Sequence, residues 1–156
     1  MEDILIKSCF IIATTLTGIL CGASLDQSIK QLPARHRIGV KAFSEYAKAA
    51  DLKNGVIWYA LLGVGAALAS ITTAILVYVN HVNASYSLPL YLGGLFAICH
   101  SICTAIAAPT YHKQKQIQDE TELEKLFNKF ETVQTVRSIF CVLNFLAFIW
   151  ALILLI

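Results

Sequence analysis

Four long apolar segments constrain this chain more than any other feature of its sequence. They cover residues 4–25, 56–79, 88–108 and 138–156, and each is close to the roughly 20 apolar residues that a helix needs to cross a bilayer. Such long, continuous runs are unlike the short alternating strands of a membrane barrel, and helices satisfy their own backbone in lipid. The sequence therefore predicts an all-α, polytopic membrane protein: one antiparallel, up-and-down four-helix bundle formed by residues 1–156.

The composition excludes other classes of protein. Apolar amino acids make up 57% of the chain and charged ones 14%, whereas about 45–50% and about 25% are usual in soluble domains. A disordered chain would be polar and highly charged. The formal net charge is only +2, and binding to a nucleic-acid backbone takes a strongly basic surface. We therefore expect membrane lipids as neighbours and no nucleic acid as a partner, and leave a homo-oligomer open.

The basic residues are distributed unevenly among the connecting segments. Eleven of the twelve Lys and Arg residues lie within 26–55 and 109–137, and none lies between the second and third spans. Because short loops rich in Lys and Arg stay on the cytoplasmic side, these two segments are predicted to be cytoplasmic and both termini non-cytoplasmic. The first span is expected to be retained, because Met1-Glu2-Asp3 is acidic where a signal peptide is basic.

The first basic segment is predicted to contain a short amphipathic helix. Pro33 is expected to break the chain after the first span, and Lys53-Asn54-Gly55 to end the short helix before the second. This helix could lie in the membrane interface or pack on the end of the bundle, and the sequence does not choose between the two. Its apolar stripe consists of Ile38, Phe43, Tyr46, Ala47, Ala50 and Leu52.

The second basic segment is predicted to be a helical stem that leads directly into the fourth span. Thr121 and Glu124 have the spacing of a capping box, and no Gly or Pro follows them. One helix is therefore expected from about Glu122 to the C-terminus.

The short connection of residues 80–87 predicts that the second and third spans form an antiparallel hairpin. Small residues such as Gly94 and the pair Gly18-x-x-x-Gly22 favour close helix packing, which we expect within the bundle rather than between subunits. The connection also contains Asn83-Ala84-Ser85, an acceptor pattern for N-glycosylation.

Polar side chains within apolar spans are the candidate functional residues, because the bilayer penalises them. We expect them to meet in a polar cleft in the cytoplasmic half of the bundle. His100, near the middle of the third span, is the candidate catalytic residue, and Arg137 lies seven residues before Asn144 on the same side of the fourth helix. The candidate ligand-binding residues are Thr17, Asp26, Gln27, Thr104, Arg137 and Asn144.

Each candidate also has a purely structural interpretation. A threonine in a membrane helix commonly bonds the carbonyl four residues earlier, an asparagine can join two helices, and Arg137 could pair with Asp26 or Glu131. For His100 the two interpretations weigh equally, because a buried imidazole needs partners. The His and Cys residues lack metal-ligand spacing, and no cofactor motif is present, so we expect neither metal nor cofactor.

Several stretches carry a family resemblance: LTGILCGASLD at 16–26, QLPAR at 31–35, Ala107-Ala108-Pro109 and FETVQTVR at 130–137. Together they resemble the small four-helix membrane proteins, mostly uncharacterised, that include the fungal anthrone oxygenases. The resemblance implies a four-helix bundle with a proline closing the third span. In a minority of members it implies cofactor-free oxygenation of anthrones, for which a buried base such as His100 and an Arg or Asn beside the enolate would be suitable. The family usually has Trp or His with Asn before the Arg of the fourth span, and residues 131–136 contain none of these.

These observations leave three classes of function as hypotheses. A small membrane-embedded enzyme that acts on a hydrophobic small molecule or lipid predicts that His100, Asn144 and Arg137 face one cavity. A structural or accessory protein predicts a closed, dry bundle. A subunit of a small transporter or channel predicts an oligomer with a continuous polar path, although the lack of carboxylates within the spans disfavours proton-coupled transport.

Overall fold

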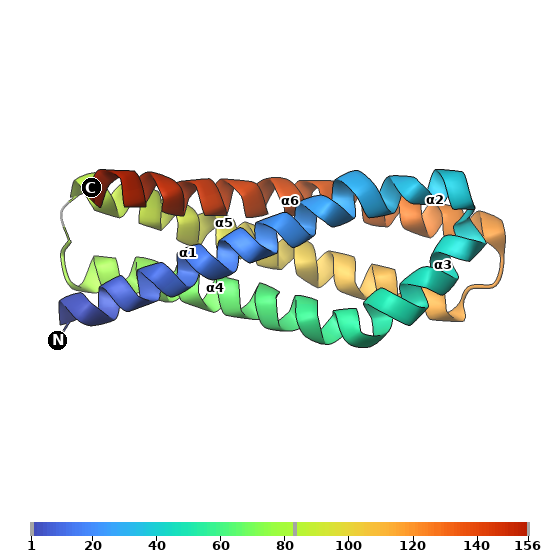
Figure 1. Cartoon of the computed structure of the whole chain (residues 1–156), viewed down its shortest axis with the longest axis horizontal. Helices are drawn as coiled ribbons and strands as arrows, with labels where there is room; N and C mark the ends of the chain where they lie inside the picture. The colour runs from blue at the N-terminus through green and yellow to red at the C-terminus, as the bar shows by residue number, and fades with distance from the viewer. Residues whose placement is uncertain (1, 83, 156) are drawn as a thin grey trace.

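Residues 2–82 and 84–155 are described by a computed structural model, and four long helices dominate this part of the chain (Figure 1). The helices pack antiparallel, with α1 against α4 and α5 against α6 among the main contacts. Each is long and apolar enough to cross a membrane. The prediction of an all-α fold is confirmed for the described residues, and the four long helices are candidate membrane spans by length and composition. The long helices are α1 (Glu2–Asp26), α4 (Gly55–Val79), α5 (Ala84–His112) and α6 (Glu120–Leu155).

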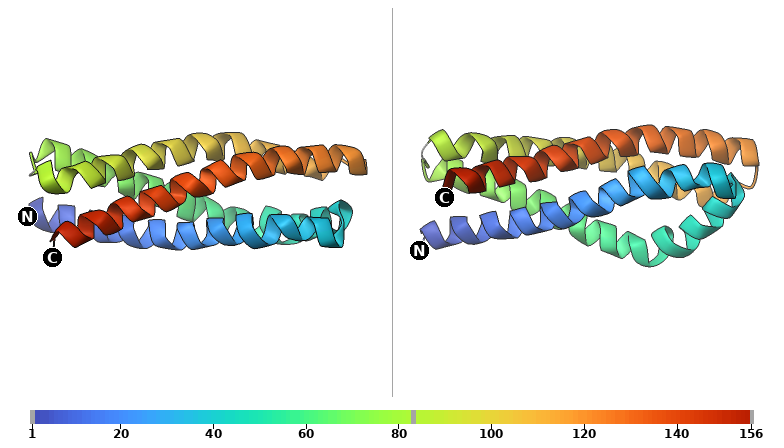
Figure 2. Two further views of the ribbon diagram at one scale, coloured as in Figure 1. Left: turned by 90° about the horizontal axis from the view of Figure 1, so that it is seen from above. Right: turned by 45° about the horizontal axis from the view of Figure 1, so that its top comes forward.

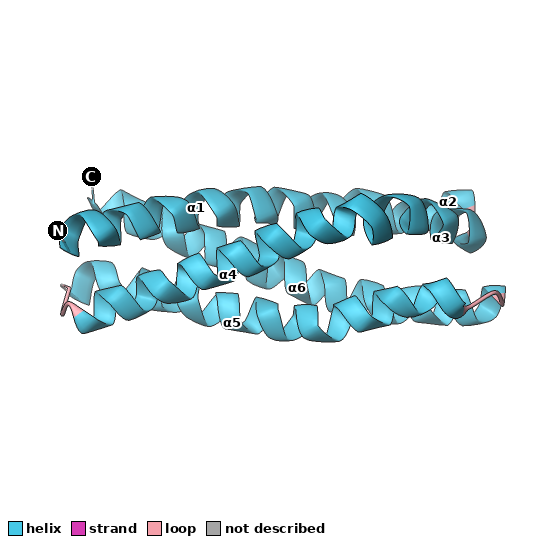
Figure 3. Cartoon of the chain, turned by 90° about the horizontal axis from the view of Figure 1, so that it is seen from below, coloured by secondary structure: helices cyan, strands magenta, loops and turns pink. Residues whose placement is uncertain are grey.

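The turns between the helices lie at the two opposite ends of the bundle. Both termini and the turn after α4 lie at one end, and the turns at Gly39 and at residues 117–119 lie at the other (Figures 1 and 3). We call the second end the basic end, because residues 26–55 and 109–137 form it. Each long helix and the helical turns continuous with it form one arm, and the four arms contain 30 to 40 residues each. An arm of this size is about 45–60 Å long, whereas the hydrocarbon core of a bilayer is about 30 Å thick. Each arm is therefore long enough to extend beyond its apolar span. Asn83, with its glycosylation pattern, lies outside the described residues.

Pro33 does not break the first arm, so this prediction is wrong. A π-helical turn, η1 (Gln27–Gln31), joins α1 to α2 (Leu32–Ile38), and the Leu32 N–H bonds the carbonyl of Gln27, five residues earlier. A proline lacks the N–H and its ring crowds the carbonyl four residues before it, and a wider π turn directly before the ring relieves that contact. The chain reverses at Gly39 instead, where φ is +85°, a value that favours glycine.

The predicted stop at Gly55 is also wrong. A second π-helical turn, η2 (Ala50–Asn54), connects α3 (Val40–Ala49) to α4, and Gly55 is itself helical, with φ −61°. A Cβ at Gly55 would lie 3.0 Å from the carbonyl oxygen of Ala50, so the wide turn favours glycine there. The arm bends at this position without interruption (Figure 2, right).

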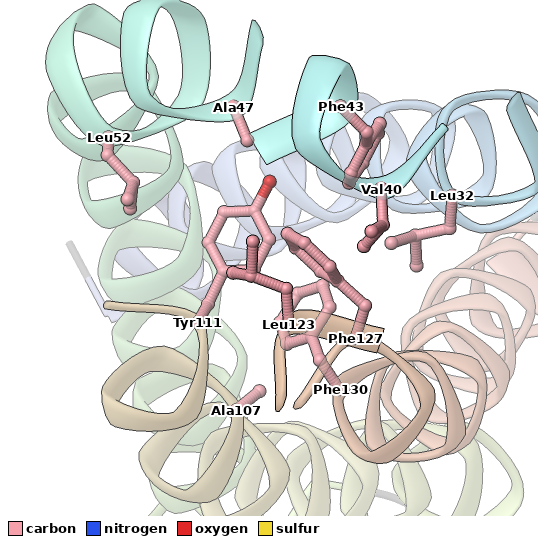
Figure 4. Close-up of a cluster of buried hydrophobic side chains, with 10 residues drawn as sticks. All are labelled: Leu32, Val40, Phe43, Ala47, Leu52, Ala107, Tyr111, Leu123, Phe127 and Phe130. Atoms are coloured by element: carbon pink, nitrogen blue, oxygen red, sulfur yellow. The ribbon is translucent and has the colours of Figure 1, made fainter. Parts of the chain in front are cut away.

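The amphipathic helix α3 packs on the end of the bundle, the second of the two alternatives. Its Phe43 is only 2% exposed and meets the ring of Phe127 edge to face, with 5.1 Å between centroids. The ring centroids of Tyr111 and Phe130 lie 4.3 Å apart in the same cluster. Side chains from α2, α3, α5 and α6 converge there (Figure 4). The basic end therefore has its own hydrophobic core.

The stem is confirmed as one helix with the fourth span, but its cap differs from the prediction. The Oδ1 atom of Asp119 accepts a 2.9 Å hydrogen bond from the N–H of Glu122, so Asp119, two residues before Thr121, caps α6. The helix α5 also continues through Pro109 to His112 before a 3₁₀ turn at Lys113–Gln116. Pro109 therefore does not close the third helix as the resemblance implies.

Small residues bring the helices of the bundle close together in the half that contains the termini. A Cβ added at Gly94 would lie 2.9 Å from the Cβ of Ala74, and one at Gly18 would lie 3.0 Å from the ring of Phe145. One at Gly22 would meet no atom within 4 Å. Gly94 and Gly18 thus serve packing within the bundle, whereas Gly22 lies on its surface.

Candidate functional site

A cavity of about 260 Å³ lies within the bundle toward the basic end. It is lined from α1, α4, α5 and α6 and from both π-helical turns. Its walls are mostly apolar, and polar side chains project into it from each of these elements. The apolar lining residues are Leu20, Leu52, Val56, Ala60, Gly63, Val64, Ala108 and Phe130, and the polar ones are Ser24, Gln27, Asp51, Tyr59, His100, Thr104, Tyr111, His112 and Arg137.

Arg137 brings a cation into this cavity. Its Nη2 donates a 3.1 Å hydrogen bond to Oε1 of Gln27, and its buried Nε has no partner among the described residues. The two carboxylates named as alternative partners are engaged elsewhere: Asp26 pairs with Lys30 at 2.5 Å, and Glu131 with Arg35 at 2.5 Å. The guanidinium is therefore held by a neutral amide and retains an unused donor.

His100 lines the same cavity from α5 and is almost fully buried. Thr104, one turn later, donates its hydroxyl to the His100 carbonyl over 2.9 Å, as expected of a threonine in a membrane helix. Across the described part of the chain, no hydrogen-bond partner reaches the imidazole ring. The ring is therefore available to a bound molecule.

Asp51 and Tyr111 form a buried pair that was not among the residues singled out from the sequence. The Tyr111 hydroxyl donates a 2.8 Å hydrogen bond to Oδ2 of Asp51, and both residues line the cavity. They lie beyond the apolar spans 56–79 and 88–108. Burial raises the pKa of Asp51, and the hydrogen bond from Tyr111 opposes this only in part. The sequence carries no clear local signal for this burial, because Lys48 and Lys53 flank Asp51 on either side.

Three of the predicted residues lie outside the cavity. Thr17 is fully buried and donates to the carbonyl of Ala13 over 2.8 Å. Asp26 sits at the surface with Lys30, and Asn144 donates to Ser70 over 3.4 Å farther along the bundle. The cavity thus brings together Gln27, His100, Thr104 and Arg137, and leaves out Thr17, Asp26 and Asn144.

Polar side chains of α1 and of the adjoining turn η1 bond to α6 beside the cavity. The hydroxyls of Ser24 and Ser138 lie 2.8 Å apart, and Ser28 is 2.6 Å from Ser138. Gln134 donates to the carbonyl of Ser24 over 3.4 Å. These contacts join the two helices across this wall of the cavity.

A second, more open hollow of about 360 Å³ lies between α4 and α5 in the other half of the bundle, and its lining is apolar apart from two tyrosines, Tyr78 and Tyr91. No group of three His, Cys, Asp or Glu side chains in residues 2–82 and 84–155 is placed to hold a metal ion. No model of a known family, no curated protein and no solved structure matches the chain. The chain is a four-helix protein with four candidate membrane spans, and its own residues and geometry are the guide to its function.

Proposed function

We propose that this membrane protein binds a hydrophobic small molecule or lipid in the cavity at the basic end. One observation carries the proposal: the walls of the cavity are mostly apolar, and a few polar side chains converge in it. Ligand sites usually have this character. A volume of about 260 Å³ is slightly below the roughly 300–1,000 Å³ of such sites. It fits one small molecule or part of one lipid.

The proposed orientation places the basic end in the cytoplasm. Eleven of the twelve Lys and Arg residues belong to the segments that form it, and such segments are retained on the cytoplasmic side. The cavity would then lie in the cytoplasmic half of the bundle, with Arg137 near the level of the lipid head groups.

Catalysis is a second candidate, supported by the presence of His100 and Arg137 in one cavity, whereas Asn144, the third residue that the enzyme hypothesis expects there, bonds Ser70 outside it. In the cofactor-free oxygenation that the sequence resemblance implies, His100 would take a proton from an activated CH₂ beside an aromatic ketone, and Arg137 would stabilise the enolate oxygen. The carbanion would react with O₂, so that the CH₂ becomes C=O and the second oxygen atom leaves as water. Membranes containing the protein would then convert anthrone to anthraquinone faster than membranes with His100→Gln, and equal rates would contradict this candidate.

A structural or accessory role and a transporter subunit remain the alternatives to ligand binding. A closed, dry bundle would favour the first, and the cavity gives it less support. The second needs an oligomer with a continuous polar path.

Two glycines allow a matched test of binding. A Cβ at Gly63 would meet no atom within 4 Å, and Gly63 lines the cavity, so Gly63→Leu fills the cavity without a backbone clash. Gly22→Leu makes the same change on the outer surface of α1, also into open space. Native mass spectrometry of the gently extracted protein should show a bound molecule in the wild type and in Gly22→Leu, and its loss in Gly63→Leu. Equal occupancy in all three, or no adduct in any, would contradict the proposal.

A further inference from the structure

The lining of the cavity differs in exposure from one side to the other. On α1 and α6, the lining residues Leu20, Ser24 and Phe130 are buried, as is Gln27 in the adjoining turn η1. On α4 and α5, several lining residues are exposed as well, and Val64 is 60% exposed. The cavity therefore opens sideways, between α4 and α5. The exposed lining residues are Val56, Ala60, Val64, Ala108 and His112.

This opening lies mainly within the apolar spans. Val56, Ala60 and Val64 belong to the span 56–79, and Ala108 ends the span 88–108. Their small or branched apolar side chains present hydrocarbon to the surroundings. In the other half of the bundle, α4 and α5 are in close contact, because a Cβ at Gly94 would lie 2.9 Å from that of Ala74. The side opening of this cavity therefore lies in the half nearer the basic end, and its apolar rim would face the bilayer. The separate hollow between α4 and α5 in the other half has Ala74 and Gly94 in its lining and contains no charged residue.

Arg137 brings a positive charge to the cavity that no carboxylate of the described residues pairs with. Arg137 contacts the Gln27 amide and no carboxylate of the described residues. Asp51, which also lines the cavity, accepts its hydrogen bond from Tyr111, and burial disfavours its charged form. A planar guanidinium with a free donor suits the two oxygens of a carboxylate or phosphate.

We propose that the ligand is an amphiphile with one acidic head group, which enters from the bilayer between α4 and α5 and places its oxyanion on Arg137. Its chain lies along Leu20, Ala60 and Val64. Because Arg137 directly precedes the span 138–156, the head group keeps the depth that it has in its own leaflet and need not cross the hydrocarbon. This inference rests on the proposed function and names the ligand class of the same cavity.

Matched pairs of ligands test the head group. Native mass spectrometry of the full chain in detergent would compare oleic acid with oleyl alcohol, which has the same chain without the charge, and dioleoyl phosphatidic acid with dioleoyl phosphatidylcholine. We expect the acidic member of at least one pair to bind about tenfold more tightly or better. The tighter of the two acids identifies the source of the oxyanion as a free carboxylate or a phospholipid. In Arg137→Gln, which removes the charge and keeps a polar amide, the preference for acid should fall to less than about threefold.

A second pair of variants tests the route, and leaves Arg137 unchanged. Val64→Trp places a bulky ring at the opening, and Leu68→Trp places the same ring one turn away on α4, where the wild-type side chain is 61% exposed and does not line the cavity. Uptake of a diazirine-labelled fatty acid, measured as cross-linked peptide, should fall in Val64→Trp and not in Leu68→Trp. Equal uptake in both variants would overturn the route.

The outcomes separate this inference from the proposed function. If acid and alcohol bind equally to the wild type, or if Arg137→Gln keeps the preference, the ligand class is wrong. In that case, if Gly63→Leu abolishes binding of the acidic and the neutral ligands alike, the cavity would still be supported as a binding site. If none of the four amphiphiles binds and no native adduct is seen, both proposals fail.

Discussion

The hydroxyl of Tyr111 donates a 2.8 Å hydrogen bond to Oδ2 of Asp51, and this bond ties the bend between α3 and α4 to the far end of α5. Both side chains are buried, and both line the cavity. The wall of the cavity nearest the basic end is therefore held in part by a carboxyl group that is poorly solvated, so its protonation bears on the stability of the fold.

Asp51→Asn is expected to change how stability depends on pH. Burial raises the pKa of Asp51 in the folded chain above the ordinary value of 3.8. Between these two pKa values the folded state holds a proton that the unfolded state has lost. The contribution of Asp51 to stability is then fully present below about pH 3.8 and disappears as the pH rises through the raised value. Asparagine keeps an acceptor for Tyr111 and has no such dependence. In thermal unfolding experiments in detergent from pH 4 to 8, the melting temperature of the variant should rise relative to that of the wild type as the pH rises. A constant difference between the two melting temperatures would contradict this.

Gly94→Ala is expected to destabilise the bundle by about 1–3 kcal/mol. The new Cβ would lie 2.9 Å from the Cβ of Ala74, which is fixed to the backbone of α4, so the two helices must move apart. Gly22→Ala, where a Cβ meets open space, is the matched control and should not lose stability. Ala74→Gly combined with Gly94→Ala should recover most of the loss, measured by chemical unfolding in mixed micelles. A double variant no more stable than Gly94→Ala would show that this contact is not the cause.

The ion pair of Arg35 and Glu131 predicts an asymmetry between two single variants. The Arg35 side chain is 3% exposed and that of Glu131 is 33% exposed, with a nitrogen–oxygen distance of 2.5 Å. Glu131→Ala leaves a buried guanidinium with Asn128 as its remaining acceptor, which should cost about 2 kcal/mol or more. Arg35→Met leaves a carboxylate that water can reach, so its loss should be smaller. The reverse order in unfolding experiments would contradict this account of the pair.

The proposed orientation can be tested with introduced cysteines. Lys41→Cys lies at the basic end and His81→Cys in the turn at the opposite end, and both wild-type residues are exposed. An impermeant maleimide should label His81→Cys on intact cells and label Lys41→Cys only after lysis, relative to the wild type with its five native cysteines. Labelling of Lys41→Cys on intact cells would reverse the orientation.

The sequence predicts the long-range design of this fold better than its local turns. The spans follow from runs of apolar residues, which the bilayer requires whatever the details of packing. Pro33 and Gly55 are usual signals for the end of a helix, and here each stands next to a π-helical turn that lets the helix continue. Such a turn depends on how several elements pack together, and no local sequence pattern predicts it.

The candidate site was predictable to the extent that helix geometry determines it. Arg137 and Asn144 do lie on a similar side of α6, but seven residues separate them by about 10 Å along the axis, and the cavity ends before Asn144 is reached. Asp51 was missed because Lys48 and Lys53 flank it, which makes it resemble an ordinary solvated loop residue. Only the bend at η2 places it inside, against Tyr111.

An experimental structure of the full chain, extracted together with its native lipids, tests the central claim most directly. We predict elongated density between α4 and α5, with its polar end at hydrogen-bond distance from the Arg137 guanidinium and its tail along Gly63 and Val64. A bundle that is closed at this position, with Arg137 paired to a carboxylate of its own chain and no density between the helices, would contradict the account.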